Sequence, residues 1–164
     1  MSQSTSHARL VSLIKAALIA ALYIILTLIN PLSYGAIQFR LSETLNCLAV
    51  FNKRYIWALT LGCAIANINS SLGAVDLVFG TLQTLVMTSL SWWVSHHLHS
   101  TASKLASVVI ICTLMSWVVA LELFLVTKVP FWMTYLTVGL GELGAMVLGA
   151  IIFWQISKRI DLSK

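Results

Sequence analysis

Long apolar runs with almost no charge inside them occupy most of this 164-residue chain. Charged residues make up 9% of the sequence, against roughly a quarter in an ordinary soluble domain. A helix needs about 20 apolar residues to cross a hydrocarbon core roughly 30 Å thick. The pattern therefore predicts an all-α integral membrane protein, a single domain over residues 1–164, with no soluble catalytic domain.

Hydropathy divides the chain into six expected transmembrane helices joined by short connections. The second and third are shorter than a comfortable span, so we expect them to be tilted, irregular or shielded by neighbours. A polar tail of about residues 1–9 precedes the first helix and lacks a cleavage site, so we expect it to be retained. The expected segments are Leu10–Asn30, Ile37–Phe51, Tyr55–Ser71, Val75–Ser95, Leu105–Thr127 and Phe131–Ile156.

The distribution of Lys and Arg predicts which side of the membrane each loop occupies. With six spans, eight of the 10 basic residues fall on the side of the N-terminus, and only Arg40 and Lys128 fall on the other. Loops rich in Lys and Arg stay in the cytoplasm, so both termini are expected there. Basic residues scattered at helix ends fix topology in this way and give no case for nucleic acid. Arg40 and Lys128 could serve a ligand or snorkel to the interface.

Four of the five acids, Glu43, Asp76, Glu122 and Glu142, lie in or beside the predicted spans. Insertion scales put a charge at the bilayer centre at about 2.5 to 3.5 kcal/mol, so each acid needs a partner or a function. On the predicted topology all four converge near the outer surface. Because positions three, four and seven apart share a helix face, the pattern predicts an outward-facing pocket lined by acids, amides and aromatics.

The pocket's predicted lining has alternatives that the sequence leaves open. Asp76 could cap its helix, and Glu43 could pair with Arg40 one turn earlier. The amides could hold helices together, and the aromatics could form an interfacial belt. The predicted substrate-binding residues are Gln38, Arg40, Glu43, Asn46, Asn67, Asp76, Gln83, Trp132, Tyr135 and Glu142.

Motifs for catalysis or metal binding are not found in the sequence. It contains no HExxH, P-loop or GxSxG pattern, so we expect a protein that is not an enzyme and has no cofactor of its own. The three cysteines, Cys47, Cys63 and Cys112, lie singly in apolar stretches and are expected in the core. His96, His97 and His99 fall at a helix end without further ligands, which argues against a metal site.

The first predicted helix carries small residues at a spacing that favours close helix packing. Ala16 and Ala20 form one small-xxx-small pair, and Ala17 and Ala21 form another. Such pairs let a second helix approach closely through van der Waals contacts. The second helix could belong to this bundle or to a partner protein.

Three stretches carry a resemblance to a known family: Ile37 to Asn46, Leu59 to Asn67, and Leu72 to Leu82. They resemble the QueT family of substrate-binding subunits, or S-components, of energy-coupling factor (ECF) transporters. The resemblance implies a small subunit that binds a vitamin-like molecule from outside a bacterial plasma membrane. It also implies as partners a transmembrane scaffold, which would dock on the alanine pairs, and two cytoplasmic ATPases that hydrolyse ATP while the bundle tips over.

The resemblance further implies a queuosine precursor, a 7-deazaguanine, as the ligand. A guanine-like edge presents N–H and NH2 donors that a carboxylate can accept in a bidentate way, while an aromatic ring stacks on the base. Cobalamin or another vitamin is an alternative within the same class, because fold does not fix ligand. An alternative of another class is a self-sufficient proton-coupled carrier with Glu122 and Glu142 as its relay.

Overall fold

The computed structural model describes residues 2–30, 33, 39–70 and 72–163, with the side chains of residues 2–6 and 8 left aside. Within these ranges the chain is helical and no strand occurs. The elements are α1 (Ser2–Leu28), the 3-10 helix η2 (Leu41–Val50), α2 (Arg54–Asn67), α3 (Ala74–Ser95), α4 (Thr101–Met115), α5 (Trp117–Thr127) and α6 (Phe131–Ser157).

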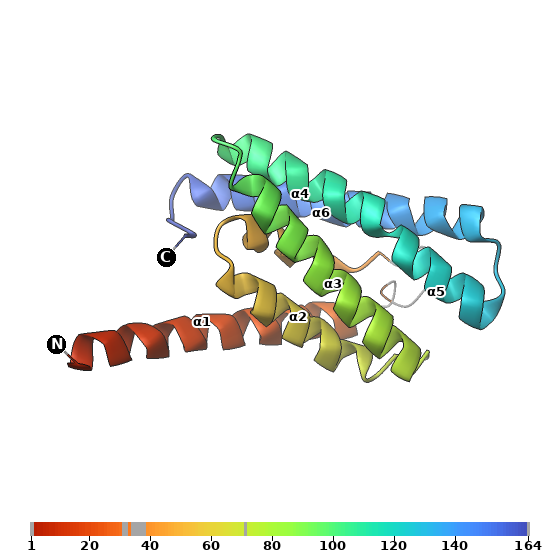
Figure 1. Ribbon diagram of the computed structural model, residues 1–164, viewed down its shortest axis with the longest axis horizontal. Helices are drawn as coiled ribbons and strands as arrows, with labels where there is room; N and C mark the ends of the chain where they lie inside the picture. Colours follow the sequence, from red (N-terminus) through yellow and green to blue (C-terminus); the bar gives the residue numbers. More distant parts are fainter. Residues whose placement is uncertain (1, 31–32, 34–38, 71, 164) are drawn as a thin grey trace.

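Helix η2 lies at the centre of the bundle. It contacts α1, α2, α3, α4 and α6, and nine of its ten residues are buried. Figure 1 shows α1 and α2 along one side, α4, α5 and α6 along the other, and α3 running obliquely between them. Both termini lie at the same end of the bundle (Figure 1).

Four stretches are long and apolar enough to cross a bilayer: Arg9–Leu28, Ala74–Ser95, Thr101–Thr127 and Phe131–Ser157. The protein is therefore a multi-pass membrane protein. The second and third predicted spans correspond to η2 and α2, which have only 10 and 14 residues. The prediction that the second segment is irregular and shielded is confirmed, because irregular backbone is tolerated at membrane depth only when protein surrounds it.

The fifth predicted segment, Leu105–Thr127, is interrupted at Ser116 between α4 and α5. The buried Ser116 hydroxyl donates to the carbonyl of Thr113 at 2.7 Å, within its own turn. Opposite it stands Gly139 of α6, where an added Cβ would lie 3.2 Å from the serine Oγ. The bend thus places Ser116 against α6 at the middle of the membrane stretch.

Two glycines allow helices to pack closely against α1 and η2. A Cβ on Gly62 of α2 would lie 2.9 Å from the Cβ of Tyr23 on α1. A Cβ on Gly149 of α6 would lie 2.5 Å from the carbonyl oxygen of Thr44 on η2. Since backbone cannot move aside as a side chain can, these positions require glycine and fix how α1 and α6 pack around the centre.

Candidate functional site

A narrow polar cavity lies between η2, α3, α5 and α6. The space between its lining atoms, including the mouth, is about 340 Å³. Its wall combines two acids, an arginine, an amide and two hydroxyls with a few apolar side chains. The lining residues are Arg40, Glu43, Gly80, Gln83, Thr84, Met87, Ser116, Val119, Val138 and Glu142.

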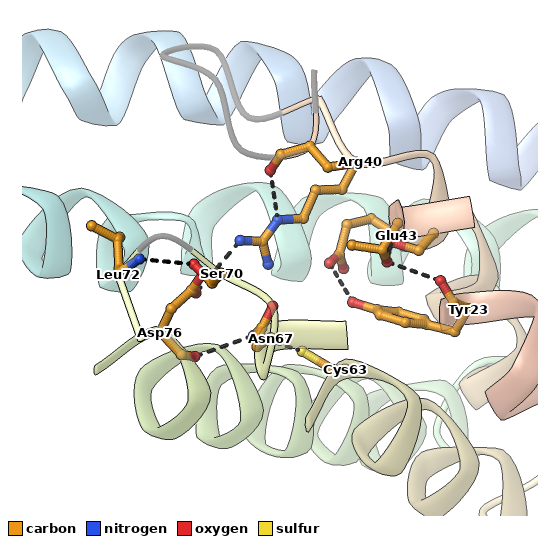
Figure 2. A network of polar contacts seen from close by, with 11 residues as sticks. Tyr23, Arg40, Glu43, Cys63, Asn67, Ser70, Leu72 and Asp76 are labelled. Atoms are coloured by element: carbon orange, nitrogen blue, oxygen red, sulfur yellow. Dashed lines mark hydrogen bonds and ion pairs between the residues drawn. The ribbon is translucent and has the colours of Figure 1, made fainter. Parts of the chain in front are cut away.

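Arg40 is the residue immediately before η2, and it lines the cavity. Asp76 of α3 balances the charge of its guanidinium group. Arg40 is 6% exposed and Asp76 is 3% exposed, and their Nη2 and Oδ1 atoms are 3.5 Å apart (Figure 2). The Arg40 Nε also donates to the carbonyl of Ser33 at 3.1 Å. Asp76 therefore joins η2 to α3 as an ion-pair partner, while Gly73, at the N-cap of α3, leaves the helix without a side-chain cap.

Glu43 is held from two sides. The Tyr23 hydroxyl of α1 donates to its Oε1 at 2.6 Å, and the amide of Asn46, one turn along η2, donates to its Oε2. Figure 2 shows the Tyr23 ring reaching across to this carboxylate. The direct ion pair of Arg40 is with Asp76, and the Arg40 charge also acts favourably on the Glu43 carboxylate.

Gln83 of α3 and Glu142 of α6 present acceptors to the cavity that nothing in the described chain satisfies. Each is 7% exposed, each lines the cavity, and the Oε1 atom of each is buried without a hydrogen-bond partner. Leaving a buried polar atom unpaired costs about 1 to 3 kcal/mol. These two oxygens are therefore the unsatisfied acceptors of the cavity wall.

Asn67 has a structural role between α2 and α3. Its amide donates to the Asp76 carbonyl at 3.1 Å and contacts the Cys63 sulfur at 3.5 Å (Figure 2). Gly80 leaves the space that this amide occupies, since an added Cβ there would collide with it. The interpretation of Asn67 as an interhelical link is confirmed, and its neighbour Asp76 is fixed by the same contact.

The structure brings together four of the predicted substrate-binding residues, Arg40, Glu43, Gln83 and Glu142. Asn46, Asn67 and Asp76 are buried directly behind them as supports and do not line the cavity. Gln38 lies outside the described residues.

Trp132 and Tyr135 are not among the residues that line the cavity in the described structure. Trp132 is 73% exposed on the outside of α6. The Tyr135 ring stacks on Phe131, and its hydroxyl donates to the carbonyl of Leu114. Both aromatics begin α6, where interfacial rings are common.

Glu122 of α5 is buried at 1% exposure, and its Oε1 has no hydrogen-bond partner. It does not line the cavity, although Val119 one turn earlier does. Lys128 ends the same helix in a left-handed conformation with φ of 60°. These two residues therefore stand beside the site without contributing to its wall.

The alanine pairs of α1 face two directions. Ala20 is buried against α2, where its carbonyl lies 3.0 Å from the Cβ position of Gly62, and Ala16 is half-buried. Ala17 and Ala21, one position further along the helix, are exposed. Internal packing thus accounts for the first pair, and only the second is open to a partner.

Sequence reasoning missed three side chains that shape the site. Tyr23 holds Glu43, while Thr84 and Ser116 supply hydroxyls to the wall. Thr84 is one helical turn from Gly80 and could have been found from that spacing. Tyr23 and Ser116 depend on contacts between distant segments, which the sequence does not reveal.

The histidines form hydrogen bonds within their own helix end. The Nδ1 atoms of His96 and His97 lie 3.2 and 3.1 Å from the carbonyls of Trp92 and Trp93. The cysteines are all buried and unbridged. In the ranges that the structure covers, no three His, Cys, Asp or Glu side chains gather closely enough to hold a metal ion.

Fold and cavity together define a multi-pass membrane protein with an unsatisfied polar site enclosed at its centre. The model of the QueT transporter family matches residues 13–158. The queuosine precursor transporter QueT of Lactococcus lactis subsp. cremoris (strain MG1363) is 40% identical over 162 residues, covering 90% of this chain and 93% of that protein. No solved structure matches the chain. The chain belongs to the QueT transporter family, which confirms the resemblance seen in its sequence.

Proposed function

We propose that this protein is the substrate-binding S-component of an ECF-type ABC transporter and that its ligand is a queuosine precursor, a 7-deazaguanine. The observation that carries the proposal is the pair of unpartnered oxygens, Glu142 Oε1 and Gln83 Oε1, at the cavity wall. The name of the Lactococcus relative supports the choice of ligand.

The chemistry of the wall fits a donor-rich base. Glu142 accepts the ring N–H and the exocyclic NH2 of a guanine-like edge, and a carboxylate suits such a pair because both its oxygens accept. The Thr84 and Ser116 hydroxyl oxygens line the same wall and can accept a further donor of the ring, while the Ser116 proton is donated to the Thr113 carbonyl. Arg40 contributes little net charge because Asp76 neutralises it, so the wall favours a neutral or cationic ligand over an anion.

The narrowness of the cavity indicates that side chains part when the ligand enters. The Glu43 carboxylate already accepts hydrogen bonds from Tyr23 and Asn46. The Glu142 Oε1 accepts none and can turn toward a ligand. Binding therefore satisfies buried acceptors that the empty protein leaves unpaired, and this exchange supplies affinity.

In the proposed complex a transmembrane scaffold docks on the Ala17–Ala21 face of α1, and two cytoplasmic ATPases hydrolyse the ATP. The end of the bundle that holds both termini faces the cytoplasm, in agreement with its excess of Lys and Arg. The setting is a bacterial plasma membrane, as for the relative's source organism.

The test is uptake into proteoliposomes. The chain alone should bind a radiolabelled 7-deazaguanine but accumulate none, and accumulation should require the scaffold, both ATPases and ATP. Uptake by the chain alone that stops when the proton gradient is removed would instead establish the carrier with Glu122 and Glu142 as relay. Binding of cobalamin in place of the deazaguanine would keep the class and overturn the ligand.

A further inference from the structure

A second, separate pocket lies at the end of the bundle that carries the termini. It is lined by Arg9, Ser12 and Leu13 of α1 and by Arg54, the first residue of α2, and its volume including the mouth is about 660 Å³. The binding site proposed above shares no residue with it. Two guanidinium groups from separate helices thus face one space.

The described lining of this pocket contains two arginines and no acid. Within the ranges that the structure covers, no carboxylate lies within ion-pair distance of Arg9 or Arg54. The Arg54 Nη1 donates to the Ser12 hydroxyl at 3.1 Å, which leaves the hydroxyl proton free to donate to an incoming oxygen. The N-terminus of α2 adds the positive end of a helix dipole. Two arginines, a hydroxyl donor and a helix N-terminus together match a phosphate group.

The position of the pocket relative to the membrane indicates the source of that phosphate. Arg9 is the first residue of the candidate span Arg9–Leu28. Leu13, which lines the pocket, is 68% exposed, and its neighbours Leu10 and Ile14 are 56% and 50% exposed. The apolar outer surface of α1 therefore begins at the pocket itself. That is the level at which lipid headgroups meet hydrocarbon, and Arg side chains anchor there.

We propose that this pocket binds the headgroup phosphate of an anionic phospholipid from the leaflet on the side of the termini. The acyl chains would lie along the exposed apolar face of α1, next to Leu13. Topology alone calls for positive charge at this end, but it does not require two arginines from different helices to converge on one serine-lined pocket. The inference does not depend on the identity of the transported ligand.

Native mass spectrometry of the purified full chain tests this proposal. The probes are phosphatidylglycerol and phosphatidylcholine, added at equal concentration to protein in detergent. The wild-type chain should retain one phosphatidylglycerol in preference to phosphatidylcholine. Arg9→Gln and Arg54→Gln should each weaken that retention about fivefold, which corresponds to about 1 kcal/mol per basic residue near an anionic surface, and the double variant should lose it.

Lys104→Gln is the matched control, because Lys104 lies in the first turn of α4 and does not line the pocket. Helix α4 begins at the same end of the bundle as the termini (Figure 1). This variant should retain phosphatidylglycerol as the wild type does. An equal loss of retention in Lys104→Gln would show that general surface charge, and not this pocket, holds the lipid. Equal retention of both lipids by the wild type would also overturn it. Inorganic phosphate at millimolar concentration should not displace the lipid, and displacement would assign the pocket to a soluble phosphate compound. Thermal unfolding in phosphatidylcholine alone checks that each variant is folded.

Discussion

Replacing Glu142 by glutamine keeps the size of a cavity-lining side chain and changes only its charge and one acceptor atom. The Glu142 Oε1 is buried and has no partner within the described chain, so a ligand donor is its expected partner. A hydrogen bond to a charged group contributes about 1.5 to 3 kcal/mol, and 1.4 kcal/mol is a factor of ten in affinity. Glu142→Gln should therefore weaken binding of a 7-deazaguanine by about 10- to 100-fold.

Glu122→Gln is the matched control for this change. Glu122 is also buried, at 1% exposure, and its Oε1 is also unpartnered, but it does not line the cavity. Both substitutions remove a buried carboxyl from a membrane helix, so any general effect on folding should appear in both. Only a direct contact with the ligand should distinguish them.

Isothermal titration of the purified chain gives the dissociation constant of each variant. The expected result is a large loss of affinity for Glu142→Gln and an unchanged value for Glu122→Gln. An unchanged affinity for Glu142→Gln would remove this residue from the site. Equal losses in both variants would show that buried charge, and not ligand contact, determines binding.

Three further predictions concern packing and assembly. Ala17→Phe should abolish co-purification with the scaffold subunit while leaving ligand titration of the isolated chain unchanged, because this side chain is exposed; loss of both would refute the docking face. Gly149→Ala places a Cβ 2.5 Å from η2 backbone and should lower the unfolding temperature by several degrees, since overpacking costs about 1 to 3 kcal/mol. Gly144→Ala, whose Cβ would lie 3.4 Å from a ring, should stay near wild type, and the reverse order would contradict the packing. Tyr23→Phe removes the 2.6 Å donor to Glu43 and should destabilise the fold by about 1 to 3 kcal/mol in denaturant unfolding; unchanged stability would show that the bond contributes nothing.

The helical membrane fold followed from the sequence because apolar length is a strong signal in a bilayer. The second segment could be predicted as irregular and shielded, but not as a 3-10 helix at the very centre, since its ten residues carry no turn or cap that specifies that form. The break at Ser116 also escaped prediction. It has no Pro or Gly beside it in the sequence, and Gly139, which lies against it, comes from the distant helix α6.

The polar residues of the site could be predicted from the sequence. Their arrangement around the cavity could not. Hydropathy identified Arg40, Glu43, Gln83 and Glu142 because such side chains are rare in spans. It could not separate the residues that line the cavity from those that support it, because a buried amide such as Asn67 serves both roles equally well by composition. Which donors pair with which acceptors is decided by contacts between distant segments, as for Tyr23 and Glu43.

The central claim is that buried, unsatisfied acceptors in one cavity capture a small solute, and native mass spectrometry of the chain alone tests it most directly. The protein is incubated with a mixture of 7-deazaguanines and cobalamin and then released from detergent in the spectrometer. The account predicts a single added mass equal to one 7-deazaguanine, greatly reduced in Glu142→Gln. Wild-type protein that carries no added small molecule under these conditions would contradict it.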